Sequence, residues 1–281
     1  MSQPTRLLII GFGLIGGSVA LGVRKAEPRS FHVTAVDVPE VLALPEARAA
    51  ADSLIEISDW TRVERALSEC TLALLAAPVR VICDQVLRVL SLANVVTDCG
   101  STKRHIVERA AKSPRAGRFV PGHPMAGLPE GGLSRASGEL FVARPWIVCP
   151  ERVDTDALMH VESLVETLGA RLMRMSAEEH DAAVARTSHL PQLIGSALTL
   201  IGSPYASSAA GPAFERATRV AGGPESMWRD IFATNGDEIA RAIQELCGEL
   251  EPIGRELGAD VGRTALADAL LARARKQRSQ S

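Results

Sequence analysis

The sequence predicts an α/β domain of the Rossmann type, with a doubly wound parallel sheet, followed by an all-α C-terminal domain. Three observations support this fold class. In the first half, short apolar runs alternate with amphipathic helical stretches, and several of these runs lack the alternation of half-exposed strands. The connections are short, which implies parallel strands with right-handed crossovers. From residue 176 the pattern is helical only, so the domains are expected at residues 1–175 and 176–281.

The predicted elements follow in chain order. Strands are expected at 7–10, 32–36, 71–76, 95–98, 146–149 and 171–175, and helices at 14–25, 59–69, 79–92, 102–112 and 153–168. In the second domain, apolar residues at i, i+3 and i+4 predict helices at 177–201, 212–220, 224–234, 237–257 and 264–276. Clusters of Gly and Pro at 202–204 and 222–224 separate these helices.

The composition excludes several classes of function. Apolar residues make up 46% and charged residues 23% of the 281 residues, which is typical of a globular protein. The 31 Lys and Arg residues do not exceed the 33 Asp and Glu residues, so no nucleic-acid partner is expected. No run of about 18 apolar residues predicts a membrane span, and no signal-peptide cleavage site follows the apolar N-terminus. A cytoplasmic protein without a membrane partner is expected.

The cysteine and histidine spacing predicts no metal site. The five cysteines are odd in number and form no CxxC pair, so reduced thiols are expected rather than a disulfide framework or a zinc site. These cysteines are Cys70, Cys83, Cys99, Cys149 and Cys247. His180 and His189 lie nine residues apart on one predicted helix. At about 3.6 residues per turn their side chains would face different directions, which argues against a metal pair.

A GxGxxG motif lies between the first predicted strand and the first predicted helix. Its residues, all assigned to cofactor binding, are Gly11, Phe12, Gly13, Leu14, Ile15 and Gly16. Such a motif allows a tight turn, a close approach of the pyrophosphate and close helix packing, although an ordinary Gly-rich turn has the same pattern. Asp37 ends the next strand, where an acidic side chain binds the ribose 2′-hydroxyl. No Arg follows Asp37 to receive a 2′-phosphate, so NAD is expected rather than NADP.

Two further strand ends contribute to the predicted cofactor site. Ala76, Ala77 and Pro78 follow the strand at 71–76, at the edge where ligands of open α/β sheets bind. Pro78 could also simply begin the next helix. Ser101 follows the strand at 95–98, where it could be a helix N-cap, a cofactor contact or a catalytic group.

His123 is the residue best suited to proton chemistry. It lies between Gly and Pro in the run Val-Pro-Gly-His-Pro-Met-Ala-Gly, which holds it in one place in a loop. An imidazole titrates near neutral pH. Beside a nicotinamide, it would supply the base that hydride abstraction from an alcohol carbon requires.

Six motifs, in order, make the chain resemble the prephenate/arogenate dehydrogenase family along nearly its whole length. They are GFGLIGGSVA at 11–20, DCGSTK at 98–103, GHPMAG at 122–127, LFVARPWIVCP at 140–150, EEHDAAVARTSHLPQ at 178–192, and TRVA with MWRDIFATN within 218–235. Any one of them is common. Their shared order on a chain of this layout is specific to the family.

The resemblance implies an NAD-dependent oxidative decarboxylation, converting prephenate to 4-hydroxyphenylpyruvate in tyrosine biosynthesis. It implies that His123 accepts the proton of the substrate's 4-substituent and that Ser101 positions this group and His123. It also implies that Arg219 binds a substrate carboxylate, a task suited to guanidinium. His189 would line the active site, with a structural or substrate-binding role. The helical domain of the family forms a homodimer, which is therefore expected here.

The sequence departs from the family at positions that the resemblance places in or beside the substrate pocket. Leu128 and Pro129 follow the GHPMAG motif, where relatives have Ser or Thr and then Glu, and Gln192 stands where many have His. Arg216 replaces an Asp three residues before Arg219. These changes remove acidic groups and add a positive one, which favours a keto-acid side chain over the ammonium group of arogenate. A 4-hydroxyl and a 4-amino group both remain compatible.

Two alternatives lie outside the family. A β-hydroxyacid or imine-type dehydrogenase shares the layout but places Lys or Asp on the first long helix of the second domain, where residues 183–195 offer His189 and Gln192 and no Lys. A non-catalytic NAD-binding dimer would need only the GxGxxG motif. The joint presence of Ser101, His123 and Arg219 argues against it.

Overall fold

The computed structural model describes residues 4–128, 130–259 and 262–280 and confirms the predicted fold class. A six-stranded parallel sheet has the order β3-β2-β1-β4-β5-β6. Its strands are β1 (Thr5–Ile10), β2 (Phe31–Asp37), β3 (Ser53–Glu56), β4 (Leu72–Leu75), β5 (Val95–Asp98) and β6 (Phe119–Val120). The strand order reverses between β1 and β4, which is where Rossmann folds bind dinucleotides.

Helices cover both faces of this sheet, and each face has its own buried apolar cluster. One face carries α1 (Leu14–Ala26), α3 (Pro45–Ala50) and α7 (Thr155–Thr167). The other carries α4 (Trp60–Glu69), α5 (Val79–Leu92) and α6 (Arg104–Ala110), while α2 (Pro39–Leu42) follows β2. The strand residues alternate between the clusters, with Leu7 and Ile9 in the first and Leu8 and Ile10 in the second. This explains why the strands are apolar throughout.

A small second sheet carries the predicted catalytic histidine. It consists of β7 (Gly122–Pro124), β8 (Pro145–Val148) and β9 (Arg171–Arg174), with β7 antiparallel and β9 parallel to β8. The sequence predicted the last two as strands but not their separation from the main sheet, because their partner β7 is too short to show a pattern. His123 is the central residue of β7, paired with Ile147.

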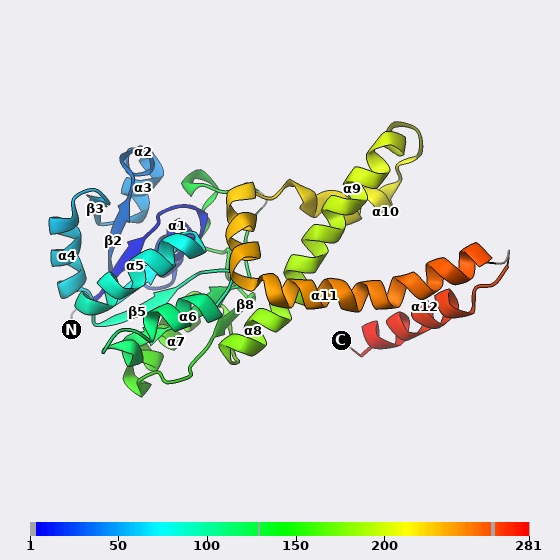
Figure 1. The fold of residues 1–281 in the computed structure, drawn as a ribbon. Coiled ribbons are helices and arrows are strands. Elements are labelled where there is room, and N and C mark those ends of the chain that lie inside the picture. The colour runs from blue at the N-terminus through cyan, green and yellow to red at the C-terminus, as the bar shows by residue number, and fades with distance from the viewer. Residues whose placement is uncertain (1–3, 129, 260–261, 281) are drawn as a thin grey trace.

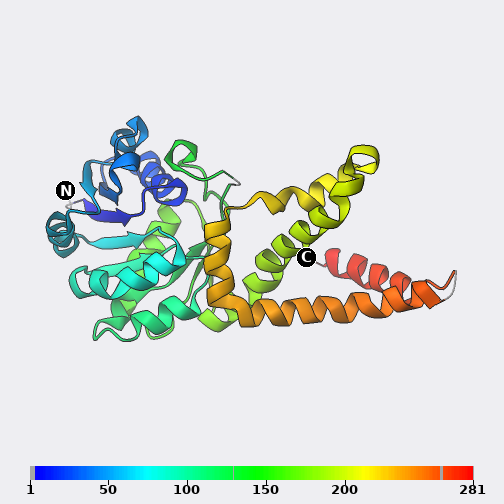
Figure 2. The same ribbon diagram turned by 45° about the horizontal axis from the view of Figure 1, so that its top comes forward.

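The helical region begins after β9 and extends away from the α/β domain (Figures 1 and 2). Its elements are α8 (Ala177–Val184), a π-helical turn η3 (Ala185–His189), α9 (Leu190–Ala209), α10 (Pro212–Thr218), the 3₁₀ turn η4 (Arg219–Gly222), α11 (Glu225–Ala259) and α12 (Ala265–Arg278). Helix α11 bends at Asn235, which has φ −138° and ψ 24°, between the two helices predicted there. In both figures α12 folds back along the distal part of α11.

The π turn was not predicted, since the sequence indicated one helix over 177–201. No helix in the described part of the chain is both long and apolar enough to cross a membrane. The five cysteines are free thiols, as expected, and burial raises the pKa of Cys70 and of Cys149 to about 12.

Candidate active site

A cleft of about 620 Å³ lies where the carboxyl ends of β1, β4 and β5 meet the helical region. It brings together eight of the sixteen residues assigned to the site from the sequence. These are Leu14, Ile15, Ala76, Ala77, Pro78, Ser101, His123 and His189. The opposite wall comes from the start of α11 and includes Met227, Trp228 and Asp230. The cleft therefore joins a predicted nucleotide site to a predicted proton acceptor.

The three glycines of the GxGxxG motif have three different structural reasons. Gly11 has φ +94°, and a Cβ there would lie 2.4 Å from the carbonyl oxygen of Ala76. A Cβ at Gly16 would lie 2.1 Å from the carbonyl oxygen of Gly11, so only Gly lets α1 pack this closely. At Gly13 a Cβ would meet nothing within 4 Å, so the loop is open on this side. Gly13 thus leaves room for a ligand beside the backbone.

The start of α1 is suited to an anion. Its N-cap is Gly13, which offers no side-chain hydrogen bond to the first turn, and that turn has no acidic residue. The free N–H groups and the helix dipole favour a phosphate there. The residues present therefore fit the pyrophosphate of a dinucleotide.

Asp37 ends β2 beside this loop and is half-buried. Its carboxylate accepts hydrogen bonds from the N–H groups of Phe12 and, at 2.7 Å, Val38. The Phe12 side chain is fully buried in the core, so it contributes to the site only through its backbone. Two acceptor oxygens leave Asp37 with capacity for ribose hydroxyls as well.

A buried ion pair lies behind the cleft and was not predicted. Lys103 and Asp98 are both fully buried and hydrogen-bonded to each other, and Lys103 Nζ also donates to the carbonyl oxygen of Gly122 at 2.6 Å. Asp98 accepts from the N–H groups of Gly100 at 2.8 Å and Gly122 at 3.0 Å. The pair ties the end of β5 to β7. It therefore positions the backbone on both sides of the cleft, next to Ser101 and His123.

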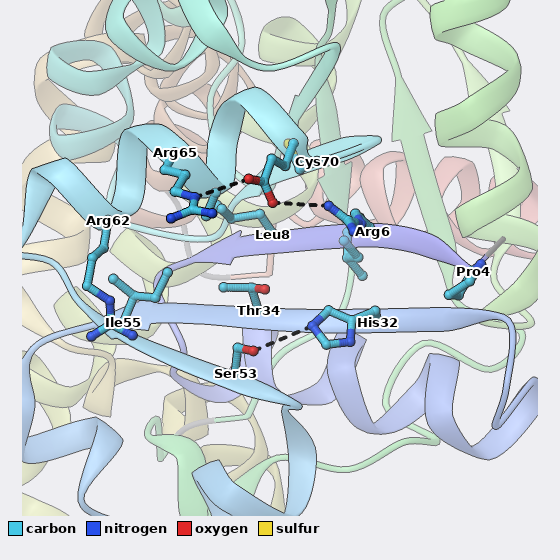
Figure 3. Close-up of a pocket in the computed structure, with 13 residues that line it drawn as sticks. Pro4, Arg6, Leu8, His32, Thr34, Ser53, Ile55, Arg62, Arg65 and Cys70 are labelled. Atoms are coloured by element: carbon cyan, nitrogen blue, oxygen red, sulfur yellow. Dashed lines mark hydrogen bonds and ion pairs between the residues drawn. The ribbon is translucent and has the colours of Figure 1, made fainter.

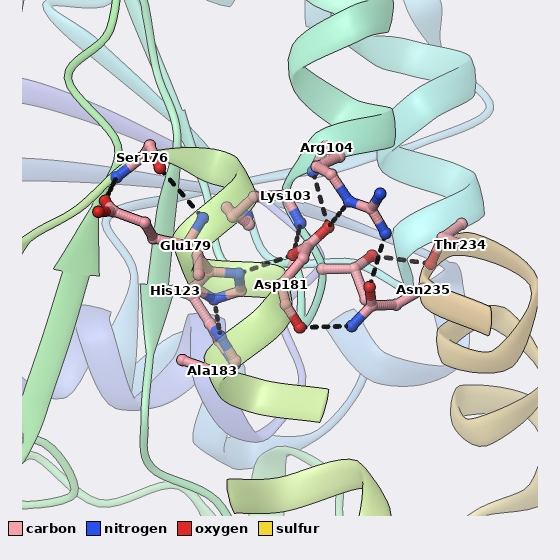
Figure 4. Close-up of polar contacts among 12 residues, drawn as sticks. Lys103, Arg104, His123, Ser176, Glu179, Asp181, Ala183, Thr234 and Asn235 are labelled. Carbon is pink, nitrogen blue, oxygen red and sulfur yellow. Dashed lines mark hydrogen bonds and ion pairs between the residues drawn. The ribbon is translucent and has the colours of Figure 1, made fainter. Parts of the chain in front are cut away.

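His123 belongs to a chain of hydrogen bonds (Figure 4). Its Nδ1 lies 2.8 Å from Nε2 of His180, and Nδ1 of His180 lies 2.8 Å from Oδ1 of Asp181. Burial, together with the nearby His180, Lys103 and His189, holds the pKa of His123 well below its ordinary value. His123 is therefore neutral at physiological pH and able to accept a proton.

Ser101 lines the cleft but is not a helix cap. Helix α6 begins at Arg104 with Lys103 as its N-cap residue, so the N-cap alternative for Ser101 is wrong. Among the described residues the Ser101 hydroxyl has no hydrogen-bond partner, so no hydrogen bond connects Ser101 to His123. Pro78, in contrast, is the N-cap residue of α5 and also lines the cleft.

His189 reaches the cleft from the π turn. It is almost fully buried, its ring meets the edge of Trp228 at 5.9 Å, and its Nδ1 lies 3.4 Å from the Asn235 amide nitrogen. Burial lowers the pKa of His189 to about 4. Both His180 and His189 lie close enough to His123 to lower its pKa. The straight helix on which they were expected to face apart does not exist, because the π turn interrupts it.

Polar contacts hold the helical region against the α/β domain beside the cleft. Arg104 of α6 binds Asp237 of α11 at 2.8 Å and donates to the Asn235 side chain at 2.9 Å. The hydrogen bonds from Arg104 lower the pKa of Asp237 below its ordinary value. Thr102 and Thr234 share a buried hydrogen bond of 2.8 Å. The bend at Asn235 is thus fixed by the α/β domain.

Three of the residues predicted to bind substrate do not line the cleft of the single chain. Gln192 is buried in α9, while Arg216 and Arg219 are exposed on α10 and η4. Leu128 lines the cleft and is 48% exposed. Pro129 lies outside the described residues. Among the described residues, no group of three or more His, Cys, Asp or Glu side chains could hold a metal ion.

A second depression lies at the opposite ends of the strands (Figure 3). It is formed by the first residues of β1, β2 and β3 and by α4, and in it Glu69 binds Arg6 at 3.1 Å and Arg65 at 3.2 Å. It contains none of the residues assigned to the site. The active site is therefore assigned to the cleft.

A Rossmann sheet with a glycine-rich loop, facing a neutral histidine across a cleft, defines a nicotinamide-dependent oxidoreductase. Comparison with known proteins makes this specific. Residues 42–174 match the family model of the prephenate dehydrogenase nucleotide-binding domain, and residues 176–264 match that of the prephenate dehydrogenase dimerization domain. The chain belongs to the prephenate dehydrogenase family. Membership of this family argues against the hydroxyacid or imine-type alternative.

Curated relatives agree with this assignment, and a solved structure shares the fold. The chain is 32% identical to prephenate dehydrogenase of Bacillus subtilis, over 88% of this chain and 68% of the relative. It is 29% identical to cyclohexadienyl dehydrogenase of Zymomonas mobilis, over 93% and 92%. The crystal structure of Aquifex aeolicus prephenate dehydrogenase in complex with hydroxyphenyl propionate and NAD⁺ has a TM-score of 0.87 at 24% identity, covering 100% of this chain and 99% of that one.

Proposed function

We propose that the protein is a cytoplasmic NAD-dependent dehydrogenase that oxidatively decarboxylates prephenate, or a close analogue, in the formation of tyrosine or a related aromatic compound. The observation that carries the proposal is His123, held neutral in a cleft that also contains the nucleotide-binding edge of the sheet. Its Nε2 has no hydrogen-bond partner among the described residues and is available to a substrate.

The proposed reaction assigns one task to each group. Bound NAD supplies the acceptor for the hydride that leaves C4 of the ring. His123 takes the proton of the 4-hydroxyl at Nε2 as the carbon–oxygen double bond forms. The bond between C1 and the ring carboxylate breaks, its electron pair enters the ring, and carbon dioxide leaves. The electron pair of the carbon–oxygen double bond returns to the 4-oxygen, which takes its proton back from Nε2 of His123. The ring becomes aromatic, which makes the step irreversible. Ser101 lines the same cleft and would bind the 4-oxygen.

Residues of the α/β domain would hold NAD. The Gly11–Gly16 loop and the start of α1 fit the pyrophosphate, Asp37 fits the ribose, and Ala76, Ala77 and Pro78 line the wall beside them. Asp37 would repel the 2′-phosphate of NADP, and Val38 follows it rather than an Arg. NAD is therefore the preferred cofactor.

The proposed substrate carries a keto-acid side chain. Leu128 contributes an apolar group to the cleft, and Arg216 adds a positive charge on α10. Neither offers a partner for the ammonium group of arogenate. The 4-amino analogue of prephenate keeps the keto acid, so the same argument admits it.

Arg219 is proposed to bind a carboxylate of the substrate. It does not line the cleft of its own chain. The helical region matches a dimerization domain and exposes many apolar side chains, which supports a homodimer formed through it. Co-expressing Arg219→Ala with His123→Asn separates two routes to the carboxylate. Recovery of activity in mixed dimers would mean that Arg219 acts in the cleft of the second copy. No recovery would mean that η4 delivers it within one chain.

The substrate panel tests the proposal. Appearance of NADH is followed with prephenate, its 4-amino analogue and arogenate, and kcat/KM is compared. We expect kcat/KM to be higher for the two keto acids than for arogenate. We expect Arg216→Asp to reduce this difference in kcat/KM. A kcat/KM for arogenate equal to or above both would contradict the charge argument. Absence of NADH formation with all three would contradict the dehydrogenase activity and favour a non-catalytic NAD-binding dimer.

A further inference from the structure

We propose that His180 and Asp181 are positioning residues that fix the proton of His123 on Nδ1 and thereby leave Nε2 as the proton acceptor. The inference rests on the proposed role of His123 as the base. It is carried by two contacts of 2.8 Å in series, from His123 to His180 and from His180 to Asp181. Both His180 and Asp181 are fully buried, so water does not compete for these hydrogen bonds.

The partners of Asp181 determine which atom donates in each of these two hydrogen bonds. Besides His180, its carboxylate oxygens accept from the backbone N–H groups of Lys103 at 2.7 Å and Arg104 at 3.0 Å, and from Arg104 Nε at 3.2 Å. These three contacts all come from N–H donors, one of them a guanidinium, so the carboxylate is ionised. An ionised carboxylate can only accept, so Nδ1 of His180 carries the proton of their hydrogen bond. A neutral His180 then has a lone pair on Nε2. That lone pair can only accept, and Nδ1 of His123 must donate to it.

The surrounding charges favour the same protonation states. Burial raises the pKa of Asp181, but its hydrogen bonds from His180, Lys103 and Arg104 outweigh this and keep the pKa below the ordinary value. Burial lowers the pKa of His180 despite the hydrogen bond to Asp181. The groups that face His123 are His180 on α8, His189 on η3 and Lys103 between β5 and α6, and Lys103 is paired with Asp98. None of them supplies a second acceptor for His123, so His180 alone selects its tautomer.

These two hydrogen bonds in series, here called the relay, also explain how the helical region takes part in catalysis. His123 lies on β7, whereas His180 and Asp181 lie on α8, and Asp181 holds the residues that begin α6. The correct tautomer of His123 therefore exists only when α8 is docked on the α/β domain. A third group that orients a catalytic histidine in this way is familiar from hydrolases.

His180→Leu and His180→Gln test the relay, with His160→Leu and His160→Gln on the exposed face of α7 as matched controls. Leucine removes the acceptor, whereas the glutamine amide can still accept from His123 and donate to Asp181. We expect His180→Leu to lower kcat/KM about 10- to 100-fold with NAD affinity unchanged. We expect His180→Gln to recover most of this loss, and the controls to match the native protein. Asp181 is left intact because it also binds two backbone N–H groups.

The tautomer is read directly from nitrogen-15 NMR of labelled histidine rings, with His123→Asn identifying the His123 signals. We expect the native protein to carry the His123 proton on Nδ1, and His180→Leu to shift it toward Nε2. A native protein with the proton on Nε2 would overturn the relay, whether or not any variant folds. The relay would also be overturned if His180→Leu kept both the native kcat/KM and the native tautomer of His123. If His123→Asn is itself fully active, the proposed base is wrong, which is a different failure.

Discussion

The α/β domain buries its apolar side chains within one chain, whereas the helical region does not. The sheet has two large clusters of fully buried residues, one on each face. The helical region has a small cluster of Ala185, Ile231 and Ile239, and leaves Leu200, Ile201 and many others exposed. Exposed apolar area of this kind marks an interaction surface. The first region therefore buries its core within one chain, while the second leaves apolar side chains that the proposed homodimer would cover.

The largest effect is expected from breaking the buried ion pair of the α/β domain. Lys103→Met leaves Asp98 charged, buried and without its cation, which should lower the free energy of unfolding by about 3–5 kcal/mol. Arg65→Met at the exposed pair with Glu69 is the control and should cost less than about 1 kcal/mol. Urea unfolding measures both. Equal losses in the two variants would mean that Lys103 is not part of the stabilising core.

A smaller effect is expected from acid, through the histidines around the cleft. His189 has a pKa of about 4 when folded and an ordinary pKa near 6.5 when unfolded. The unfolded chain therefore binds more protons between these values, and stability must fall as pH falls through this window, by on the order of 3 kcal/mol from His189. Urea unfolding at a series of pH values should show this, and His189→Gln should flatten the curve. A native stability that is constant from pH 7 to pH 4.5 contradicts it.

The smallest effect on the α/β domain is expected from the exposed helical face. Leu200→Glu with Ile201→Glu should halve the mass in solution and reduce turnover, while NAD affinity stays within about twofold because the dinucleotide site lies in one chain. Met159→Glu, on an exposed position of α7, should change neither. Light scattering and NAD titration supply the measurements. A double variant that keeps the native mass would place the assembly surface elsewhere.

The features that the sequence could predict are local in the chain, whereas those that it could not predict depend on contacts between distant residues. The turn at Gly11, the open side of Gly13 and the strand end at Asp37 each follow from local sequence, since a parallel strand and its loop impose their own pattern. The contacts of His180 are not local. They depend on a three-residue strand and on α8 packing against it, across 57 residues from His123.

The helical half shows the limit in a second way. The bend at Asn235 coincides with a predicted gap between two helices, because the sequence carries a break there. The π turn ending at His189 has no such signal, since its residues continue a helical pattern and only its packing against α11 reveals it. The buried pair of Lys103 and Asp98 could not be predicted either, because Lys is rarely buried and is expected at the surface.

The central claim is that His123 is the proton acceptor for hydride transfer to NAD, and single-turnover kinetics test it most directly. With prephenate and NAD both saturating, His123→Asn should form NADH about 10²- to 10⁴-fold more slowly than the native protein. Its dissociation constant for NAD should be unchanged, because His123 lies across the cleft from the dinucleotide loop. NADH formation by His123→Asn at the native rate would contradict the claim.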